Sequence, residues 1–141
     1  MRDLPRKLTV GELGELFEGR TRFVERLAAL DDPLGRARTI AAALSDEEKK
    51  EVLDAHPAIG AKKLSARSAA EQGDDEAPEL DELNRRYEQR FGFRFVVFVD
   101  GRPRREIVPI LRRRLERTRA EELSTALDEL VSIALDRWQR S

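Results

Sequence analysis

The sequence contains no cysteine and only one histidine among its 141 residues. The absence of cysteine excludes a disulfide framework, a thiolate metal site and a cysteine nucleophile. One histidine cannot form a multi-histidine metal centre, so we expect no catalytic metal. This histidine, His56, is the one side chain whose ordinary pKa lies near neutrality, and proton transfer at physiological pH is expected to begin with it.

Long apolar runs and a large net charge are also missing. The longest apolar runs, such as Phe95 to Val99, are too short to span a bilayer, and the amino terminus has no apolar signal region. The 27 basic and 28 acidic residues leave a net charge of −1, which gives no overall attraction to nucleic acid or anionic membranes. We therefore expect a cytoplasmic protein without nucleic-acid or membrane partners, folded as one compact domain.

Most apolar residues recur at helical spacing. The pairs Thr9 with Glu12 and Ser45 with Glu48 match the capping box that opens many helices. Helices are expected to begin near Thr9, Thr21, Asp32, Ser45 and Pro78, around Pro109, and at about Arg119. Because short turns join most of these segments, the sequence predicts an all-α bundle of about seven to eight helices.

Two prolines help to place helix starts. Asp32 is expected to cap the third helix, with Pro33 at its first position. Pro109 is expected in the first turn of the helix that carries Ile110 and Leu111, where its missing N–H costs nothing.

The segment near 93–100 has the composition of a β-strand, because it is rich in aromatic and β-branched residues and begins with an alternation of apolar and polar residues. No second run of similar character exists to pair with it, and a lone strand leaves its backbone groups without partners. We therefore expect an extended, non-sheet segment buried between helices.

His56 is followed by Pro57, which pushes the preceding residue out of the helical region. The imidazole should therefore sit at a helix end, where it can point into a cleft. The alternative interpretation is a helix-terminal histidine that satisfies a carbonyl or faces solvent.

Arg137 continues the apolar stripe of the last helix, which carries Leu123, Leu127, Leu130 and Ala134. A buried guanidinium needs an anionic partner, such as a carboxylate or a substrate oxyanion. The alternative is a helix-end arginine that reaches solvent or holds the last carbonyls of its own helix.

Glu71 lies three residues after Ser68, which is the capping-box spacing, but Gly73 and two aspartates follow where an apolar helix should begin. Glu71 is therefore either a structural cap or, with Gln72, a polar wall for a small molecule.

A cluster of arginines follows the extended segment and could suggest nucleic-acid binding. The cluster consists of Arg102, Arg104, Arg105, Arg112, Arg113, Arg114, Arg117 and Arg119. Because no aromatic platform is interleaved with these residues, we interpret them as a solvated helix face.

Taken in order, several short motifs resemble the OHCU decarboxylases, which act on 2-oxo-4-hydroxy-4-carboxy-5-ureidoimidazoline in purine degradation. The motifs are His56-Pro57-Ala58-Ile59-Gly60, Ser68-Ala69-Ala70-Glu71-Gln72, Tyr87, Phe91-Gly92-Phe93-Arg94-Phe95-Val96-Val97, and Ile133-Ala134-Leu135-Asp136-Arg137-Trp138. Each motif alone is unspecific, but together they span nearly the whole chain.

The resemblance implies an all-helical, cofactor-free and usually homodimeric enzyme, with residues 1–141 as a single OHCU decarboxylase-like domain and a small-molecule substrate. It implies catalytic roles for His56, Glu71 and Arg137. It implies that the substrate pocket is lined by Pro57, Ser68, Gln72, Phe95, Val97, Phe98 and Val99. The expected reaction is decarboxylation to (S)-allantoin.

The residues Gly73-Asp74-Asp75 depart from the pattern of the family, which has an Ala-Gly-Leu-like run after the Glu-Gln pair. This change leaves open a decarboxylase that acts on a related ureido or carboxylated heterocycle. It also leaves open a non-catalytic helical module that keeps the same fold and binds a small anion or a protein.

Overall fold

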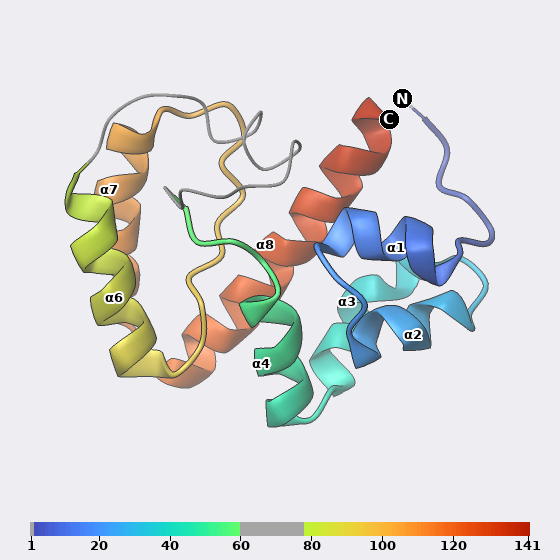
Figure 1. Ribbon diagram of the computed structural model, residues 1–141, viewed down its shortest axis with the longest axis horizontal. Helices are drawn as coiled ribbons and strands as arrows, with labels where there is room; N and C mark the ends of the chain where they lie inside the picture. The colour runs from blue at the N-terminus through green and yellow to red at the C-terminus, as the bar shows by residue number, and fades with distance from the viewer. Residues whose placement is uncertain (1, 60–77) are drawn as a thin grey trace.

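The computed structural model describes residues 2–59 and 78–141 (Figure 1). Seven helices lie in these residues, and no strand does. They are α1 (Val10–Phe17), α2 (Arg22–Ala28), α3 (Pro33–Ala43), α4 (Asp46–Asp54), α6 (Glu79–Phe91), α7 (Arg104–Arg114) and α8 (Arg119–Arg140). The predicted all-α fold is confirmed.

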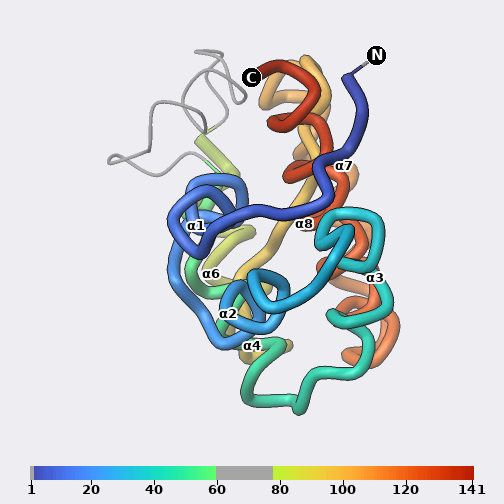
Figure 2. Tube along the Cα trace, turned by 90° about the vertical axis from the view of Figure 1, so that its right-hand side faces the viewer, coloured from blue at the N-terminus to red at the C-terminus, as the bar shows by residue number. Residues whose placement is uncertain are grey.

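Helix α8 runs through the centre of the molecule. Helices α1, α3 and α4 pack against it, and α2 packs on these three helices in turn. Helices α6 and α7 form a pair on the other side of α8 (Figure 1). The amino-terminal segment passes beside α8 (Figure 2), and the indole N–H of Trp138 in the last turn of α8 donates to the carbonyl of Asp3 at 2.9 Å.

Local side-chain hydrogen bonds start several helices where the sequence predicts them. Thr9 and Ser45 form complete capping boxes at α1 and α4, and Thr21 accepts a hydrogen bond at the start of α2. Asp32 occupies the expected N-cap position, but the expected hydrogen bond from its side chain is absent. Helix α3 does begin at Pro33, but Asp32 has a left-handed backbone (φ 53°) and its side chain makes no capping hydrogen bond.

The expected position of Pro109 is also wrong. Helix α7 begins at Arg104, so Pro109 lies inside the helix and not in its first turn. A proline there removes one hydrogen bond of the helical ladder. Burial of Ile107, Val108 and Leu111 holds the helix together across that gap.

The segment from Phe93 to Val99 is extended and forms no sheet, as predicted. Gly92 takes a left-handed conformation (φ 82°) that ends α6 and turns the chain into this segment. The rings of Phe93 and Phe95 then pack edge-on against Tyr87 of α6, with centroids 5.9 and 5.2 Å away. Figure 1 shows the segment passing between the α6–α7 pair and the rest of the bundle.

Glu122 of α8 is fully buried and neutralises a group of charges from other elements. Its Oε1 accepts from the Tyr87 hydroxyl and from Arg114 Nε, both at 2.6 Å, and its Oε2 accepts from Arg117 at 2.8 Å. Arg114 also donates to the carbonyl of Val96 at 2.8 Å. One carboxylate thus ties α6, α7 and the extended segment to α8.

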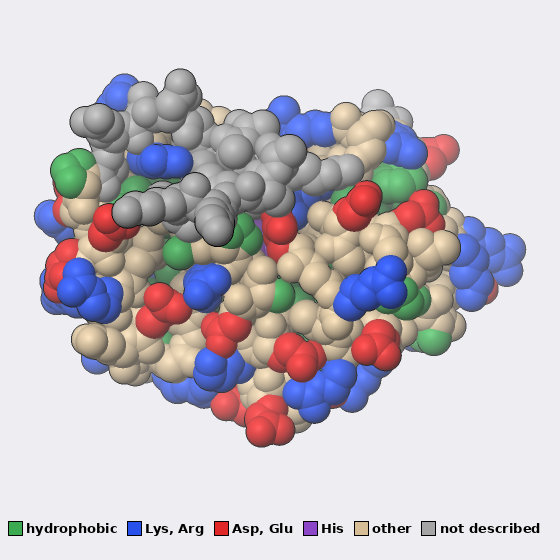
Figure 3. All heavy atoms as spheres, in the orientation of Figure 1, with side chains coloured by type: hydrophobic (Ala, Val, Ile, Leu, Met, Phe, Trp, Pro, Cys, Tyr) green, Lys and Arg blue, Asp and Glu red, His purple; other side chains and the backbone are tan. Residues whose placement is uncertain are grey.

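The interpretation of the arginine cluster as one solvated face is therefore only partly correct. Arg114 is buried, and Arg102 and Arg119 donate to the carbonyls of Phe98 and Phe91. Arg112 and Arg113 are exposed, as in a solvated face. On the face drawn in Figure 3, basic and acidic side chains are intermixed, without a patch of one sign. Among the described residues, no helix is both long and apolar enough to cross a membrane.

We predict that Glu122→Gln lowers the free energy of unfolding by about 3 kcal/mol or more, because it leaves Arg114 buried beside a neutral group. Urea unfolding measures this loss. The control is Glu116→Gln at an exposed position of the same region, expected to change stability by less than about 0.5 kcal/mol. Equal effects of the two substitutions would contradict the role given to Glu122.

Candidate active site

His56 lies directly behind α4, as the His-Pro sequence predicts. Its backbone N–H donates to the carbonyl of Leu53 at 3.2 Å, and its side chain is only 7% exposed. The imidazole Nδ1 is buried and has no hydrogen-bond partner among the described residues. A solvent-facing histidine is thereby ruled out, and no group of residues 2–59 or 78–141 is bonded to this ring nitrogen.

Three charged side chains from three separate elements lie close enough to His56 to change its pKa. Burial is the largest influence and lowers the pKa, because it disfavours the charged ring. Arg137 and Arg94 lower it further by repulsion, and Glu18 partly opposes them. The pKa falls from its ordinary value of 6.5 to about 4, so the imidazole is neutral at physiological pH.

Arg137 is buried on α8, and its guanidinium reaches the end of α1. One Nη donates to the carbonyl of Leu16 and the other pairs with Glu18, each at 3.0 Å. In these contacts the guanidinium neither reaches solvent nor holds the last carbonyls of its own helix. The two alternatives that the sequence left open for Arg137 therefore do not describe these contacts. The anionic partner that a buried arginine requires includes a protein carboxylate.

Glu18 owes its position to an unusual backbone conformation. It ends α1 in the left-handed region (φ 64°), which costs a residue other than glycine roughly 1 kcal/mol or more. Its N–H closes the helix on the carbonyl of Gly14. Sequence reasoning missed Glu18, because an acidic residue before Gly19 reads only as a helix end.

Sequence reasoning also missed Arg94. Its Nη1 donates to the carbonyls of His56 at 2.7 Å and Asp54 at 3.3 Å. The signal was present, because Arg94 is the only charged residue in an otherwise apolar run from Phe91 to Val99.

The structure brings His56 and Arg137 together, and it places the remaining expected residues as follows. Pro57 is half-buried beside His56. Phe95, Val97 and Val99 are buried and Phe98 is half-buried. The Phe95 ring lies under the guanidinium of Arg114 at 4.6 Å, within the aromatic cluster around Tyr87. Ser68, Glu71 and Gln72 lie outside the described residues.

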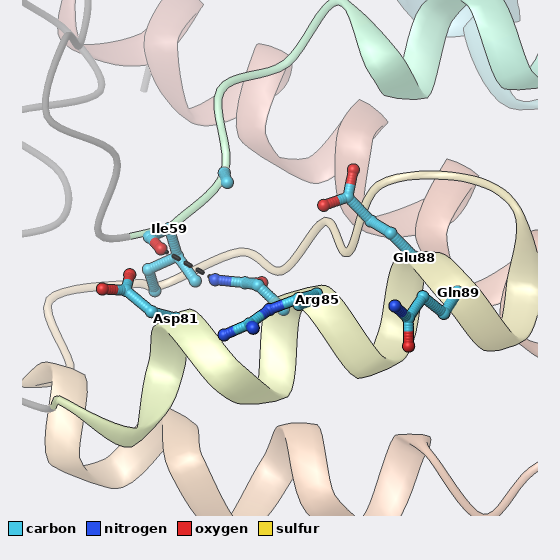
Figure 4. A pocket seen from close by; sticks show the side chains of 7 residues that line it. Ile59, Asp81, Arg85, Glu88 and Gln89 are labelled. Atoms are coloured by element: carbon cyan, nitrogen blue, oxygen red, sulfur yellow. Dashed lines mark hydrogen bonds between the residues drawn. The ribbon is translucent and has the colours of Figure 1, made fainter.

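A cleft of about 530 Å³ opens beside Ala58 and Ile59, which follow His56-Pro57 (Figure 4). Ala58 and Ile59 form one wall, and α6 forms the other with Asp81, Asn84, Arg85, Glu88 and Gln89. A second cleft of about 370 Å³ lies between α3, α4 and α8. His56 and Arg137 line neither cleft. Within residues 2–59 and 78–141, no group of three or more His, Cys, Asp or Glu side chains is placed to hold a metal ion.

Comparison with known sequences gives a consistent result. The profile of the OHCU decarboxylase family matches residues 2–139. The chain is 36% identical over 137 residues to the uric acid degradation bifunctional protein PucL of Bacillus subtilis (strain 168), covering 86% of this chain and 28% of that protein. It is 29% identical over 140 residues to 2-oxo-4-hydroxy-4-carboxy-5-ureidoimidazoline decarboxylase of Haloferax volcanii, covering 89% and 83%. The chain thus spans about a quarter of the bifunctional relative.

Comparison with solved structures confirms the fold. A crystal structure of OHCU decarboxylase in the presence of (S)-allantoin aligns with a TM-score of 0.73 and 24% identity, covering 89% of this chain and 94% of that one. A crystal structure of (S)-allantoin synthase aligns with a TM-score of 0.66 and 22% identity, covering 91% and 47%.

The depressed pKa of His56 predicts how stability changes with pH. Between pH 6.5 and about 4 the unfolded chain binds a proton at this residue and the folded chain does not, so stability falls as pH falls through that window. The loss is on the order of 3 kcal/mol. Urea unfolding of the wild type and His56→Gln at pH 7, 5.5 and 4 isolates it, because the variant lacks the titrating ring. A constant stability difference across this range would contradict the assigned pKa.

Proposed function

Because the chain belongs to the OHCU decarboxylase family, we propose that it decarboxylates 2-oxo-4-hydroxy-4-carboxy-5-ureidoimidazoline to (S)-allantoin in urate degradation. The names of the two relatives, one a uric acid degradation protein and the other this decarboxylase, support the substrate. The observation that carries the proposal is the buried, neutral imidazole of His56 close to the Arg137–Glu18 ion pair.

The substrate itself can accept the electrons that decarboxylation releases, because a ring C=N bond is adjacent to the carbon that loses CO₂. When the bond from C4 to the carboxylate breaks, its electron pair moves into the C4–C5 bond, and the pair of the neighbouring ring C=N moves onto nitrogen, which takes a proton. The C4 hydroxyl then loses its proton as C4 becomes a carbonyl, and C5 gains one. The net change is uptake of one proton and release of CO₂. The protein has to orient the substrate, exclude water and move protons.

We assign the proton transfer to His56. A neutral imidazole can accept a proton, and its pKa of about 4 keeps it in that form over the physiological range. Its buried Nδ1 is a ring nitrogen that no group in the described part of the chain engages. In the proposed reaction the imidazole polarises or deprotonates the 4-hydroxyl group.

We assign substrate anchoring to Arg137, which holds an oxygen-bearing group of the anionic substrate near His56. By resemblance to the family, Glu71 would hold ring or ureido N–H groups and orient the imidazole. The rest of the proposed pocket consists of Pro57, Ser68, Gln72, Phe95, Val97, Phe98 and Val99. Burial of Phe95, Val97 and Val99 is compatible with a site that excludes water.

The test follows optical activity with circular dichroism after the substrate is generated enzymatically from urate. The wild type is expected to convert it to (S)-allantoin faster than the spontaneous reaction, with an enantiomeric excess. His56→Asn is expected to lose about 100-fold or more in rate, because it removes the acid–base group. An absence of enantiomeric excess with the wild type would favour the non-catalytic module. An unchanged rate in His56→Asn would contradict the role of His56.

We also propose, from the same resemblance, that the protein is a cytoplasmic homodimer. Size-exclusion chromatography with light scattering should give twice the mass of the chain. A monomer at micromolar concentration would contradict the dimer while leaving the proposed reaction in place.

A further inference from the structure

The four-residue turn from His56 to Ile59, here called the His-Pro turn, is held at both of its ends by side chains from distant parts of the chain. At its start, Arg94 of the extended segment donates to the carbonyl of His56 at 2.7 Å. At its end, Asn84 of α6 donates to the carbonyl of Ile59 at 2.9 Å (dashed line in Figure 4). Both bonds are made to backbone oxygens and neither is made to the imidazole.

The start of the turn is fixed by more than one contact. The same Nη1 of Arg94 reaches the carbonyl of Asp54 at 3.3 Å, and the backbone N–H of Arg94 donates to the Asp54 carboxylate at 3.0 Å. Glu88 of α6 lies 3.5 Å from Arg94 Nε, within ion-pair distance but without a hydrogen bond. The end of α4 and residue 94 are therefore locked together.

The end of the turn is fixed by a buried amide. Asn84 is 6% exposed, and within residues 2–59 and 78–141 its Oδ1 has no hydrogen-bond partner, so the described side-chain bond of Asn84 is the one to Ile59. A buried amide with an unsatisfied oxygen lowers stability. Keeping such a group at the wall of the cleft beside the turn is consistent with a role other than stabilising the fold.

Among the described residues the imidazole Nδ1 has no hydrogen-bond partner, so the backbone contacts of the turn are the described contacts that place the ring. Pro57 restricts the backbone of both itself and His56, so a shift of the His56 carbonyl also moves the ring. A displacement of about 1 Å at a reacting group can cost about 100-fold in rate.

From these contacts we propose that Arg94 and Asn84 are positioning residues that clamp the His-Pro turn and so set the place and direction of the His56 imidazole. This inference rests on the proposed function, in which His56 transfers the proton. Neither residue is assigned contact with the substrate.

The clamp is tested with Arg94→Met, which removes the hydrogen bonds and the charge, and with Arg94→Lys, which keeps the charge but loses the planar fork. Asn84→Ala removes the bond to Ile59. The matched control is Arg119→Met. Arg119 also donates to a backbone carbonyl, that of Phe91, and pairs with Asp46 at the opposite end of α4, but it does not touch the turn.

Two readouts separate positioning from stability. The first is the decarboxylation assay. The second is the imidazole NMR spectrum of labelled protein, which is unambiguous because His56 is the only histidine. We expect kcat to fall about 10- to 100-fold in all three clamp variants, with KM changed less than about threefold. The imidazole signals should shift in each, whereas the control should keep its kcat within about twofold and its imidazole signals.

The two Arg94 variants also separate the effect of the Arg94 charge on the His56 pKa from the effect of its hydrogen-bond geometry on kcat. Arg94, Arg137 and Glu18 are the described charged groups that act on the His56 pKa. Arg94→Met should raise that pKa, because one repelling cation is lost, while Arg94→Lys should leave it nearly unchanged and still lower kcat. Circular dichroism confirms folding beforehand. If Arg94→Met does not fold, the other two clamp variants carry the same test.

The inference is overturned if the folded clamp variants keep wild-type kcat or wild-type imidazole signals, or if the control loses as much activity as they do. The NMR arm needs no substrate. A wild type without decarboxylase activity would therefore refute the proposed function, while unchanged imidazole spectra in the variants would refute the clamp.

Discussion

Two charged side chains of α8 are buried, and each requires a partner of opposite sign. The rest of the structure depends on these two pairings. Glu122 and Arg137 are separated by 15 positions, which is about 22 Å along a helix, and both lie on its buried side. A buried charge without a partner is strongly destabilising, so each one determines what must pack at its end of the helix. Glu122 is paired with cations from α7 and the α7–α8 turn, and Arg137 is paired with the end of α1.

These two pairings frame the candidate site. The Glu122 group holds the extended segment through Arg114 and the carbonyl of Val96, and this segment carries Arg94 to the His-Pro turn. The Arg137–Glu18 pair brings a guanidinium and a carboxylate close to His56 from the other side. The imidazole therefore lies between the extended segment on one side and the Arg137–Glu18 pair on the other. Burial and two nearby cations keep it neutral. A base with this environment needs no metal ion to be in its proton-accepting form.

Much of the fold could be predicted from the sequence because its signals are local. Capping boxes at Thr9 and Ser45 and the glycine that ends α6 mark helix ends within a few residues. The extended segment was predictable from the lack of a pairing strand. Pro109 was misplaced because burial of neighbouring residues, which the sequence does not display, carries α7 through it.

The site was less predictable, because its contacts join residues that are far apart in the chain. The burial of Arg137 follows from helical spacing, but its pairing with Glu18 spans 119 positions and depends on a left-handed residue. The support given by Arg94 and Asn84 spans 38 and 25 positions. His56 was found because it is the only histidine and precedes a proline. Glu71, Ser68 and Gln72 stay predictions.

The dependence of kcat/KM on pH tests the central claim most directly, since this quantity reports the ionisation of the free enzyme. A neutral His56 acting as the base predicts a rate that is level from pH 8 to about pH 5 and falls with an apparent pKa near 4. A fall centred near 6.5, the ordinary value for histidine, or a rate that rises on acidification through that pH, would contradict the claim that a buried neutral imidazole carries the reaction.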